Sequence, residues 1–113
     1  MEENPAFTRI RKDIETHAVV LYMEGTPMFP LTNRGAAVTQ ALDLMGVAYK
    51  AVNLNDDPEI REAIKAAPDA PETPHLYIHG RFAGGGAEVR DLARSGALKA
   101  LLDAAGIAAQ PIS

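Results

Sequence analysis

The residues of this chain that could do chemistry are concentrated in one loop, from Gly25 to Gly35, which reads Gly-Thr-Pro-Met-Phe-Pro-Leu-Thr-Asn-Arg-Gly. A run of apolar residues precedes the loop and a helical pattern follows it. Thr32 is well suited to begin that helix, because a threonine hydroxyl can accept a hydrogen bond from a backbone amide one turn later. The first turn of a helix also offers free N–H groups and the positive end of the helix dipole. We therefore expect a ligand to bind at this loop.

Three features of the chain each have a structural and a functional interpretation. Thr32 is either a helix cap or a functional hydroxyl, and the cap is favoured. Arg34 falls in the first helical turn, where a cation opposes the dipole, so it is either an exposed binding residue or a solvated side chain. The glycines at positions 84–86 form either a tight turn, which is favoured, or a cradle for an anion.

Composition excludes several classes of function. The net charge of -4, with no basic cluster, argues against nucleic acid as a partner. The chain has no cysteine, which excludes disulfides, thiolate catalysis and cysteine-bound metal. His75 and His79 would lie roughly 13 Å apart along one strand, too far to share a metal ion, so no metal site is expected. No apolar run approaches the ~20 residues that span a bilayer and the N-terminus lacks the features of a secretory signal, which predicts a cytoplasmic protein.

The elements that would position the loop follow from periodicity. A helix is expected over residues 5–16, with Phe7, Ile10 and Ile14 on its buried face. The continuous apolar run at 19–23 predicts a central strand buried on both faces. A second helix should end at Gly46, and residues 47–54 have a short extended pattern. Asp56 or Asp57 should then cap a helix that carries Pro58 in its first turn.

The C-terminal half has a different pattern. Residues 75–78 and 81–83 predict a hairpin that turns at Gly80, and the three glycines that follow should break its second strand. A helix carrying Val89 comes next. Ser95 is expected to cap a last helix, which Gly106 closes. The whole order predicts a single domain over residues 1–113, with a core at about 5–105, of mixed α/β class whose first two strands are parallel.

Several motifs, in matching order and spacing, resemble those of the monothiol glutaredoxins. They are Gly25-Thr26-Pro27 with Phe29-Pro30, Asp57-Pro58-Glu59-Ile60-Arg61, Pro74-His75-Leu76-Tyr77-Ile78 and Gly80-Arg81-Phe82-Ala83-Gly84-Gly85. The resemblance extends from about Ile10 to Leu102. It implies a thioredoxin-like fold, with a four-stranded mixed sheet and helices on both faces. It also implies a cis peptide bond before Pro74, and one groove formed by the loop, the Thr73-Pro74 turn and the glycine turn.

The sequence departs from this family at the residues that carry the family's chemistry. The family's Cys-Gly-Phe-Ser motif is replaced by Thr32-Asn33-Arg34-Gly35, so no thiolate is present for disulfide exchange or for holding a 2Fe-2S cluster. We therefore expect no glutaredoxin activity and no conventional cluster.

The resemblance also implies which residues would hold glutathione, and few of them are kept. Glu24 stands in place of a lysine, and Gly86-Ala87 stands in place of a Cys-Asp pair. Arg61 matches the family and is either an inherited ligand contact or a surface charge. The backbone of Thr73 could still pair with an extended peptide. The expected groove therefore contains Glu24, Thr32, Asn33, Arg34, Arg61, Thr73, Pro74, Gly85, Gly86 and Ala87.

Two classes of function follow from these departures. The first is a binding or scaffold domain without redox activity, which recognises a protein, an extended peptide or a small anion, and by analogy works near iron–sulfur or iron-homeostasis proteins. The second is a transferase-like enzyme in which Thr32 or Tyr22 stabilises the thiolate of bound glutathione. The loss of charges that would hold glutathione disfavours the second class. Whether the protein forms a homodimer is left open.

Overall fold

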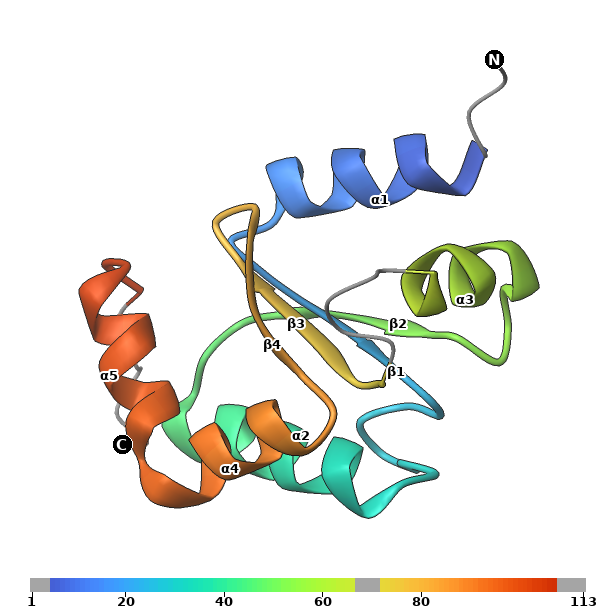
Figure 1. Cartoon of the computed structure of the whole chain (residues 1–113). Helices are drawn as coiled ribbons and strands as arrows, with labels where there is room; N and C mark the ends of the chain where they lie inside the picture. Colours follow the sequence, from blue (N-terminus) through green and yellow to red (C-terminus); the bar gives the residue numbers. More distant parts are fainter. Residues whose placement is uncertain (1–4, 67–71, 108–113) are drawn as a thin grey trace.

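The computed structural model describes residues 5–66 and 72–107, which form nine helices and strands (Figure 1). In chain order they are α1 (Pro5–Thr16), β1 (Val19–Met23), α2 (Asn33–Met45), β2 (Lys50–Asn53), α3 (Pro58–Lys65), β3 (His75–Ile78), β4 (Arg81–Gly85), α4 (Ala87–Ser95) and α5 (Ala97–Ala104). Within these two ranges no helix combines the length and apolar character needed to cross a bilayer.

The strands form one mixed sheet in the order β2-β1-β3-β4. β1 is parallel to β2, with Leu21 opposite Ala51, and antiparallel to β3, with Leu21 opposite Leu76. All five residues of β1 are buried. The prediction of a central strand, parallel to the next strand along the chain, is therefore confirmed.

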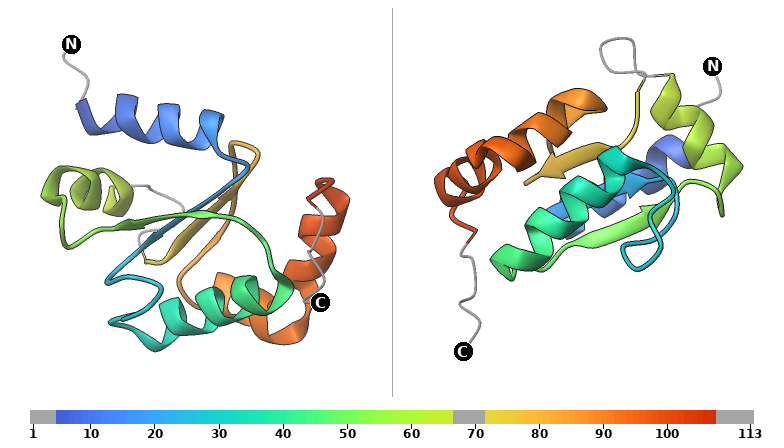
Figure 2. Two further views of the ribbon diagram at one scale, coloured as in Figure 1. Left: turned by 180° about the vertical axis from the view of Figure 1, so that it is seen from behind. Right: turned by 90° about the horizontal axis from the view of Figure 1, so that it is seen from below.

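Helices cover both faces of the sheet (Figures 1 and 2). Because side chains alternate along a strand, Val19, Leu21 and Met23 pack into the core formed with α2, α4 and α5. Val20 and Tyr22 point to the other face and pack with residues of α1 and α3. The predicted layer arrangement is thus confirmed, and the loop after β1 emerges between these two helical layers.

Helix boundaries agree with the sequence signals at several positions. Asp57 caps α3, its carboxylate accepting a hydrogen bond from the Ile60 amide at 3.2 Å. Gly46 ends α2 in the left-handed conformation, with φ 68°. The turn between β3 and β4 is made by His79 and Gly80, both with positive φ. The predicted hairpin is therefore confirmed, and only its second strand differs in length from the expectation.

The prediction that glycines 84–86 break the second strand of the hairpin is wrong for the first two. β4 includes Gly84, opposite Leu76, and Gly85, opposite His75. A Cβ at Gly85 would lie 3.0 Å from the backbone oxygen of Glu72 and 3.1 Å from the His75 ring. Small residues are therefore needed here for close packing within the strand, and only Gly86, with φ 57°, turns the chain.

Three other details differ from the expectations. Ser95 is the last residue of α4 and does not occupy the capping position of α5, which Gly96 takes, although the Ser95 hydroxyl does accept a hydrogen bond from the Ala97 amide. Phe7 is 41% exposed, because Ala6 and Ile10 form the buried face of α1. The extended segment at 47–54 pairs as a strand only over Lys50–Asn53.

Candidate functional site

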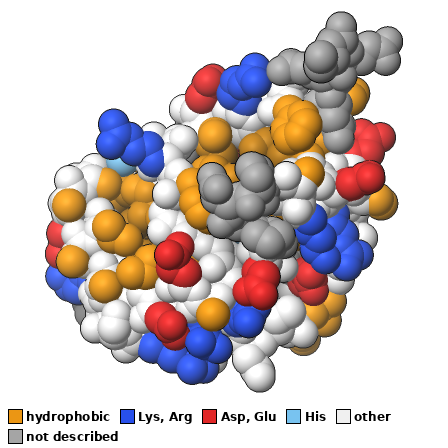
Figure 3. Space-filling view, viewed as in Figure 1, with side chains coloured by type: hydrophobic (Ala, Val, Ile, Leu, Met, Phe, Trp, Pro, Cys, Tyr) orange, Lys and Arg blue, Asp and Glu red, His pale blue; other side chains and the backbone are white. Residues whose placement is uncertain are grey.

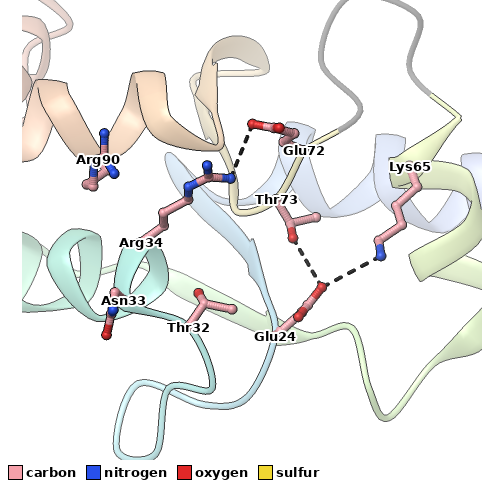
Figure 4. Close-up of a pocket in the computed structure, with 8 residues that line it drawn as sticks. All are labelled: Glu24, Thr32, Asn33, Arg34, Lys65, Glu72, Thr73 and Arg90. Carbon is pink, nitrogen blue, oxygen red and sulfur yellow. Dashed lines mark hydrogen bonds and ion pairs between the residues drawn. The ribbon is translucent and has the colours of Figure 1, made fainter.

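The groove lies at the end of the sheet where β1 leads into α2, and it encloses a hollow of about 540 Å³ (Figure 4). Its walls come from the loop after β1, the first turn of α2, the last turn of α3, the segment before β3, and α4. The residues that line it are Glu24, Thr32, Asn33, Arg34, Lys65, Glu72, Thr73 and Arg90.

The loop that leads to α2 is a small hairpin fixed by its own backbone. The amide of Thr26 donates to the carbonyl of Phe29 at 3.2 Å, and the amide of Phe29 donates back at 3.1 Å. The amide of Leu31 donates to the carbonyl of Glu24 at 3.1 Å. Gly25 has φ 90°, and a Cβ there would lie 2.5 Å from the carbonyl oxygen of Phe29. Only glycine fits this position, so the loop holds Thr32 at the groove by backbone geometry.

Thr32 occupies the N-cap of α2, as the sequence predicts. Its hydroxyl oxygen accepts a hydrogen bond from the amide of Gly35 at 3.0 Å. The first turn of α2 contains no acidic residue. Within the described part of the chain, the Thr32 hydroxyl has no hydrogen-bond partner that could act as a base. The hydroxyl is therefore used to start the helix, and nothing here activates it as a nucleophile.

Glu24 is held on the α3 side of the groove. Its carboxylate accepts a hydrogen bond from the Thr73 hydroxyl at 3.3 Å and lies 3.7 Å from the Lys65 ammonium (Figure 4). Glu24 stands where the resemblance places a lysine, and its charge alone would repel the carboxylate of a bound tripeptide. Lys65, from the last turn of α3, now offsets much of that charge.

A second ion pair joins the opposite walls. The Arg34 guanidinium donates to the Glu72 carboxylate at 3.2 Å (Figure 4). Gly86 lies directly beside this pair, because a Cβ on it would be 2.8 Å from a Glu72 carboxylate oxygen and 3.5 Å from the Arg34 guanidinium. Arg34 and Glu72 therefore cover the place where α4 begins.

Five of the ten predicted groove residues line the hollow, namely Glu24, Thr32, Asn33, Arg34 and Thr73. The Thr73–Pro74 peptide bond is cis, as the resemblance implied. The amide of Gly86 donates to the carbonyl of Pro74 at 3.0 Å, which joins the start of α4 to the cis-proline turn. Gly85 packs against Glu72, the lining residue before this turn.

The other five expected groove residues do not line the hollow: Arg61, Pro74, Gly85, Gly86 and Ala87. Ala87 is the first residue of α4. Arg61 lines a separate hollow beside α3, to which Lys65 also contributes. The roles predicted for these residues stay predictions.

Sequence reasoning missed three lining residues: Lys65, Glu72 and Arg90. Lys65 is four residues after Arg61 and therefore lies on the same side of α3, one turn nearer the groove. That spacing was a usable signal. Glu72 directly precedes Thr73, which was itself predicted to lie in the groove, so that position was also a usable signal. Arg90 gave none, since it reaches the groove only through the turn at Gly86 that begins α4. With them, the lining has three cationic side chains and two carboxylates.

The residues present do not fit a cysteine-ligated iron–sulfur cluster. The chain contains no cysteine, and the Thr32 hydroxyl that occupies the family's cysteine position is a hard oxygen atom engaged by the Gly35 amide. In the described ranges no three histidine, aspartate or glutamate side chains gather as a set of metal ligands. Glutathione would meet Glu24 on one wall and the Arg34–Glu72 pair on the other.

Comparisons with known proteins agree with this architecture. The glutaredoxin family model matches residues 19–83. A probable monothiol glutaredoxin 2 from Rickettsia conorii is 36% identical over 92% of this chain and 97% of its own length. The mitochondrial monothiol glutaredoxin-5 of Saccharomyces cerevisiae is 41% identical over 87% of this chain and 70% of its own length.

Solved structures place the chain in the same class. The truncated monomeric mutant of Trypanosoma brucei 1-C-Grx1 superimposes with a TM-score of 0.77 at 27% identity, covering 93% of this chain and 96% of that one. Reduced apo GrxS14 from poplar superimposes with a TM-score of 0.72 at 31% identity, covering 88% of this chain and 91% of that one. The fold is therefore thioredoxin-like. Within that class, the chain belongs to the glutaredoxin family and is similar to its monothiol members.

Proposed function

We propose that this chain is a monothiol-glutaredoxin-like binding domain without redox activity, whose groove recognises an extended segment of a protein partner. One observation carries the proposal: the residue at the family's cysteine position, Thr32, has its hydroxyl committed to the N-cap of α2. Thiol–disulfide exchange needs a sulfur nucleophile, and the chain has none. The fold and the groove are retained, so the function that remains is recognition.

The backbone beside the cis-proline supports an extended ligand. Thr73 forms no backbone hydrogen bond with the residues that the structure describes. A peptide in the groove could pair with it as a strand pairs with a sheet edge, which gives affinity independent of side chains. By analogy with the family, a partner involved in iron–sulfur or iron homeostasis is part of this proposal. So is a cytoplasmic location, although the yeast relative is mitochondrial.

The transferase-like alternative needs a hydroxyl that faces the groove. Tyr22 is fully buried between the sheet and the α1–α3 layer, and burial raises the pKa of its phenol far above the usual value. It therefore cannot serve as a proton source at the groove. Thr32 is the remaining candidate, and its hydroxyl already caps α2.

A deglutathionylation assay tests the absence of redox activity. We expect no turnover above buffer for the natural chain. Turnover by Thr32→Cys would show that the rest of the groove still supports thiol chemistry, whereas no turnover would show that Glu24, Arg34 and Ala87 have altered the groove as well. Thr32→Ser is the matched control, since it keeps a hydroxyl and the cap. Turnover by the natural chain would overturn the proposal.

Calorimetry with reduced glutathione separates the binding domain from the transferase. Glu24 and the Arg34–Glu72 pair line the groove where a tripeptide would bind. We therefore expect no binding at micromolar concentrations, and tighter binding when Glu24→Lys restores a cation. Micromolar binding by the natural chain would favour the transferase instead.

A further inference from the structure

Each of the three cations that line the groove has a carboxylate of this chain beside it. The ion pairs are Arg34–Glu72 at 3.2 Å, Lys65–Glu24 at 3.7 Å and Arg90–Asp91 at 3.1 Å. The face seen in Figure 3 has a similar character, since acidic and basic side chains lie next to one another along its lower and right edges. Among the described residues, the groove therefore offers a ligand no cation that lacks a carboxylate partner.

Glu24 is fixed in the groove from two sides. Its backbone carbonyl accepts a hydrogen bond from the Leu31 amide at 3.1 Å, and its carboxylate accepts one from the Thr73 hydroxyl at 3.3 Å (Figure 4). The Glu24 side chain is only 23% exposed, so most of it is packed against the protein. A ligand carboxylate near Lys65 would therefore lie beside the fixed Glu24 carboxylate, and like charges repel. A ligand ammonium near Glu24 would meet the Lys65 ammonium in the same way.

The Arg34–Glu72 pair balances charge on the other side of Thr73. Glu72 directly precedes Thr73, so its carboxylate is carried by the segment that presents the Thr73 backbone to the groove. The bond to Glu72 engages one terminal nitrogen of the Arg34 guanidinium, which has further N–H donors. Such a donor can bond a main-chain carbonyl, which has no net charge. The groove thus keeps hydrogen-bonding capacity for a ligand backbone, while its ionic groups are matched internally.

We propose that the groove accepts an extended segment whose side chains are uncharged where it passes Thr73, and that Glu24 determines this selectivity. The main chain of the segment pairs with the Thr73 backbone, which has no backbone hydrogen bond among the described residues. Because main-chain groups are neutral, this pairing leaves both flanking ion pairs intact. The inference rests on the proposed function, and it names the chemistry of the segment and the residue that selects it.

Selection from a phage-displayed library of random linear peptides on the full chain, at about 150 mM salt, is the first experiment. We expect enrichment of peptides that contain a run of uncharged residues. The strongest binder is then synthesised with each residue of that run replaced in turn by Glu, by Lys and, as the uncharged match, by Gln. Measured by fluorescence anisotropy, the Glu and Lys peptides should bind the natural chain about fivefold more weakly than the Gln peptide at the positions that pass Thr73.

Glu24→Gln is the decisive variant, because glutamine keeps an acceptor for the Thr73 hydroxyl but removes the charge that pairs with Lys65. We expect the Gln peptide to bind this variant within about twofold of the natural chain, and the Glu peptide to bind it about fivefold more tightly than it binds the natural chain. Salt at about 500 mM should remove this gain, and the Lys peptide should show none. Glu15→Gln is the matched control, since it removes the same charge at the opposite end of the sheet and should leave all three affinities unchanged.

The outcomes separate this inference from the proposed function. If the Glu or Lys peptides bind the natural chain as well as the Gln peptide does, or if the selection enriches acidic or basic peptides, the inference fails and the proposed function stands. The same holds if Glu24→Gln, shown by circular dichroism to be folded, leaves the penalty for the Glu peptide unchanged. If no peptide binds the natural chain, both fail.

Discussion

Two helices of this protein begin with similar cap geometry but carry side chains of opposite charge in their first turns. Asp57 caps α3 and Glu59 follows in its first turn. Thr32 caps α2 and Arg34 follows. Since a helix N-terminus is stabilised by negative charge, α3 begins in a favourable electrostatic environment and α2 does not. The start of α3 therefore serves stability, whereas the start of α2 directs its positive end and a cation toward the groove.

The difference extends to what fixes each helix start. Asp57 is held by Arg9 of α1, which donates a hydrogen bond to its carboxylate. Among the residues that the structure describes, no charged side chain holds the Thr32 cap of α2 in this way, and the glycine-dependent hairpin before it sets its position. The contrast predicts that the start of α3 is destabilised by loss of a charge and the start of α2 by a change of backbone conformation. Mutations can test these two predictions separately.

Gly25→Ala is expected to have the largest effect. Its φ of 90° strains any other residue, and a Cβ would collide with the Phe29 carbonyl at 2.5 Å. We expect the free energy of unfolding to fall by about 3 kcal/mol, measured by urea denaturation. The matched control is Gly96→Ala, with φ 84° but nothing within 4 Å of the new Cβ, for which a loss of about 1 kcal/mol is expected. Equal losses would show that the hairpin does not position α2.

Asp57→Ala should come next, because it removes the cap of α3 and the bond from Arg9 together. We expect the melting temperature at pH 7 to fall by about 5 °C, measured by differential scanning calorimetry. Asp56→Ala is the control. Asp56 is exposed, and its one hydrogen bond among the described residues is donated by its backbone amide, which the substitution keeps. An equally large decrease of the melting temperature in Asp56→Ala would contradict a specific role of the Asp57 cap.

The same carboxylate gives a pH dependence with a defined sign. The bond from Arg9, and then that from the Ile60 amide, lower the pKa of Asp57 below 3.8 in the folded state. The unfolded chain therefore takes up the proton first as the pH falls. The stabilisation is present above about pH 4 and is lost below it, so the melting temperatures of the natural chain and Asp57→Asn should converge toward pH 2. If the two melting temperatures differ by the same amount from about pH 4 to about pH 2, the Asp57 carboxylate is not the source of the stabilisation.

Thr32→Ala should destabilise the protein less than Asp57→Ala does, because only a single neutral hydrogen bond is lost. We expect a decrease of about 1 kcal/mol in the free energy of unfolding, measured by urea denaturation. Thr32→Ser, which keeps the hydroxyl, should stay close to the natural value. If Thr32→Ala leaves stability unchanged, the hydroxyl is not acting as a cap and a functional role regains weight.

The fold was largely predictable from the sequence, because its signals are local. The apolar run of β1, the Asp57–Pro58 start of α3 and the Gly46 end of α2 each lie within a few residues of the feature that they determine. The errors arose where packing decides. Phe7 satisfied the helical period but is 41% exposed. Gly84 and Gly85 continue a strand because they pair with Leu76 and His75 across the hairpin.

The candidate site was predictable only in its backbone. The loop and the cap follow from motifs that a short segment contains, and the cis-proline turn was implied by the resemblance to the monothiol glutaredoxins. The ion pairs do not, since Arg34 and Glu72 are 38 residues apart and Lys65 meets Glu24 only after the sheet brings α3 beside β1. Pairing of charges across a groove depends on tertiary structure, and no local pattern encodes it.

Arg34→Ala should have the smallest effect on stability, because two opposing contributions nearly cancel. It removes a cation that opposes the α2 dipole, which is stabilising, and it breaks an exposed ion pair with Glu72, which is slightly destabilising. In the natural background we expect a change within about 0.5 kcal/mol. In a Glu72→Ala background the pair is already absent, so the same substitution should raise the free energy of unfolding by about 0.5 kcal/mol.

This double-mutant cycle isolates the cation at the start of α2 from its partner. Urea denaturation at low ionic strength is the appropriate measurement, and 1 M salt should abolish the gain, because exposed charges are screened over a few ångströms there. If Arg34→Ala destabilises the protein even without Glu72, the guanidinium contributes packing at the groove, and the contrast between the two helix starts is not one of charge. If it stabilises as expected, the natural chain keeps a cation at a position that is unfavourable for folding, which favours a role for Arg34 in binding a ligand.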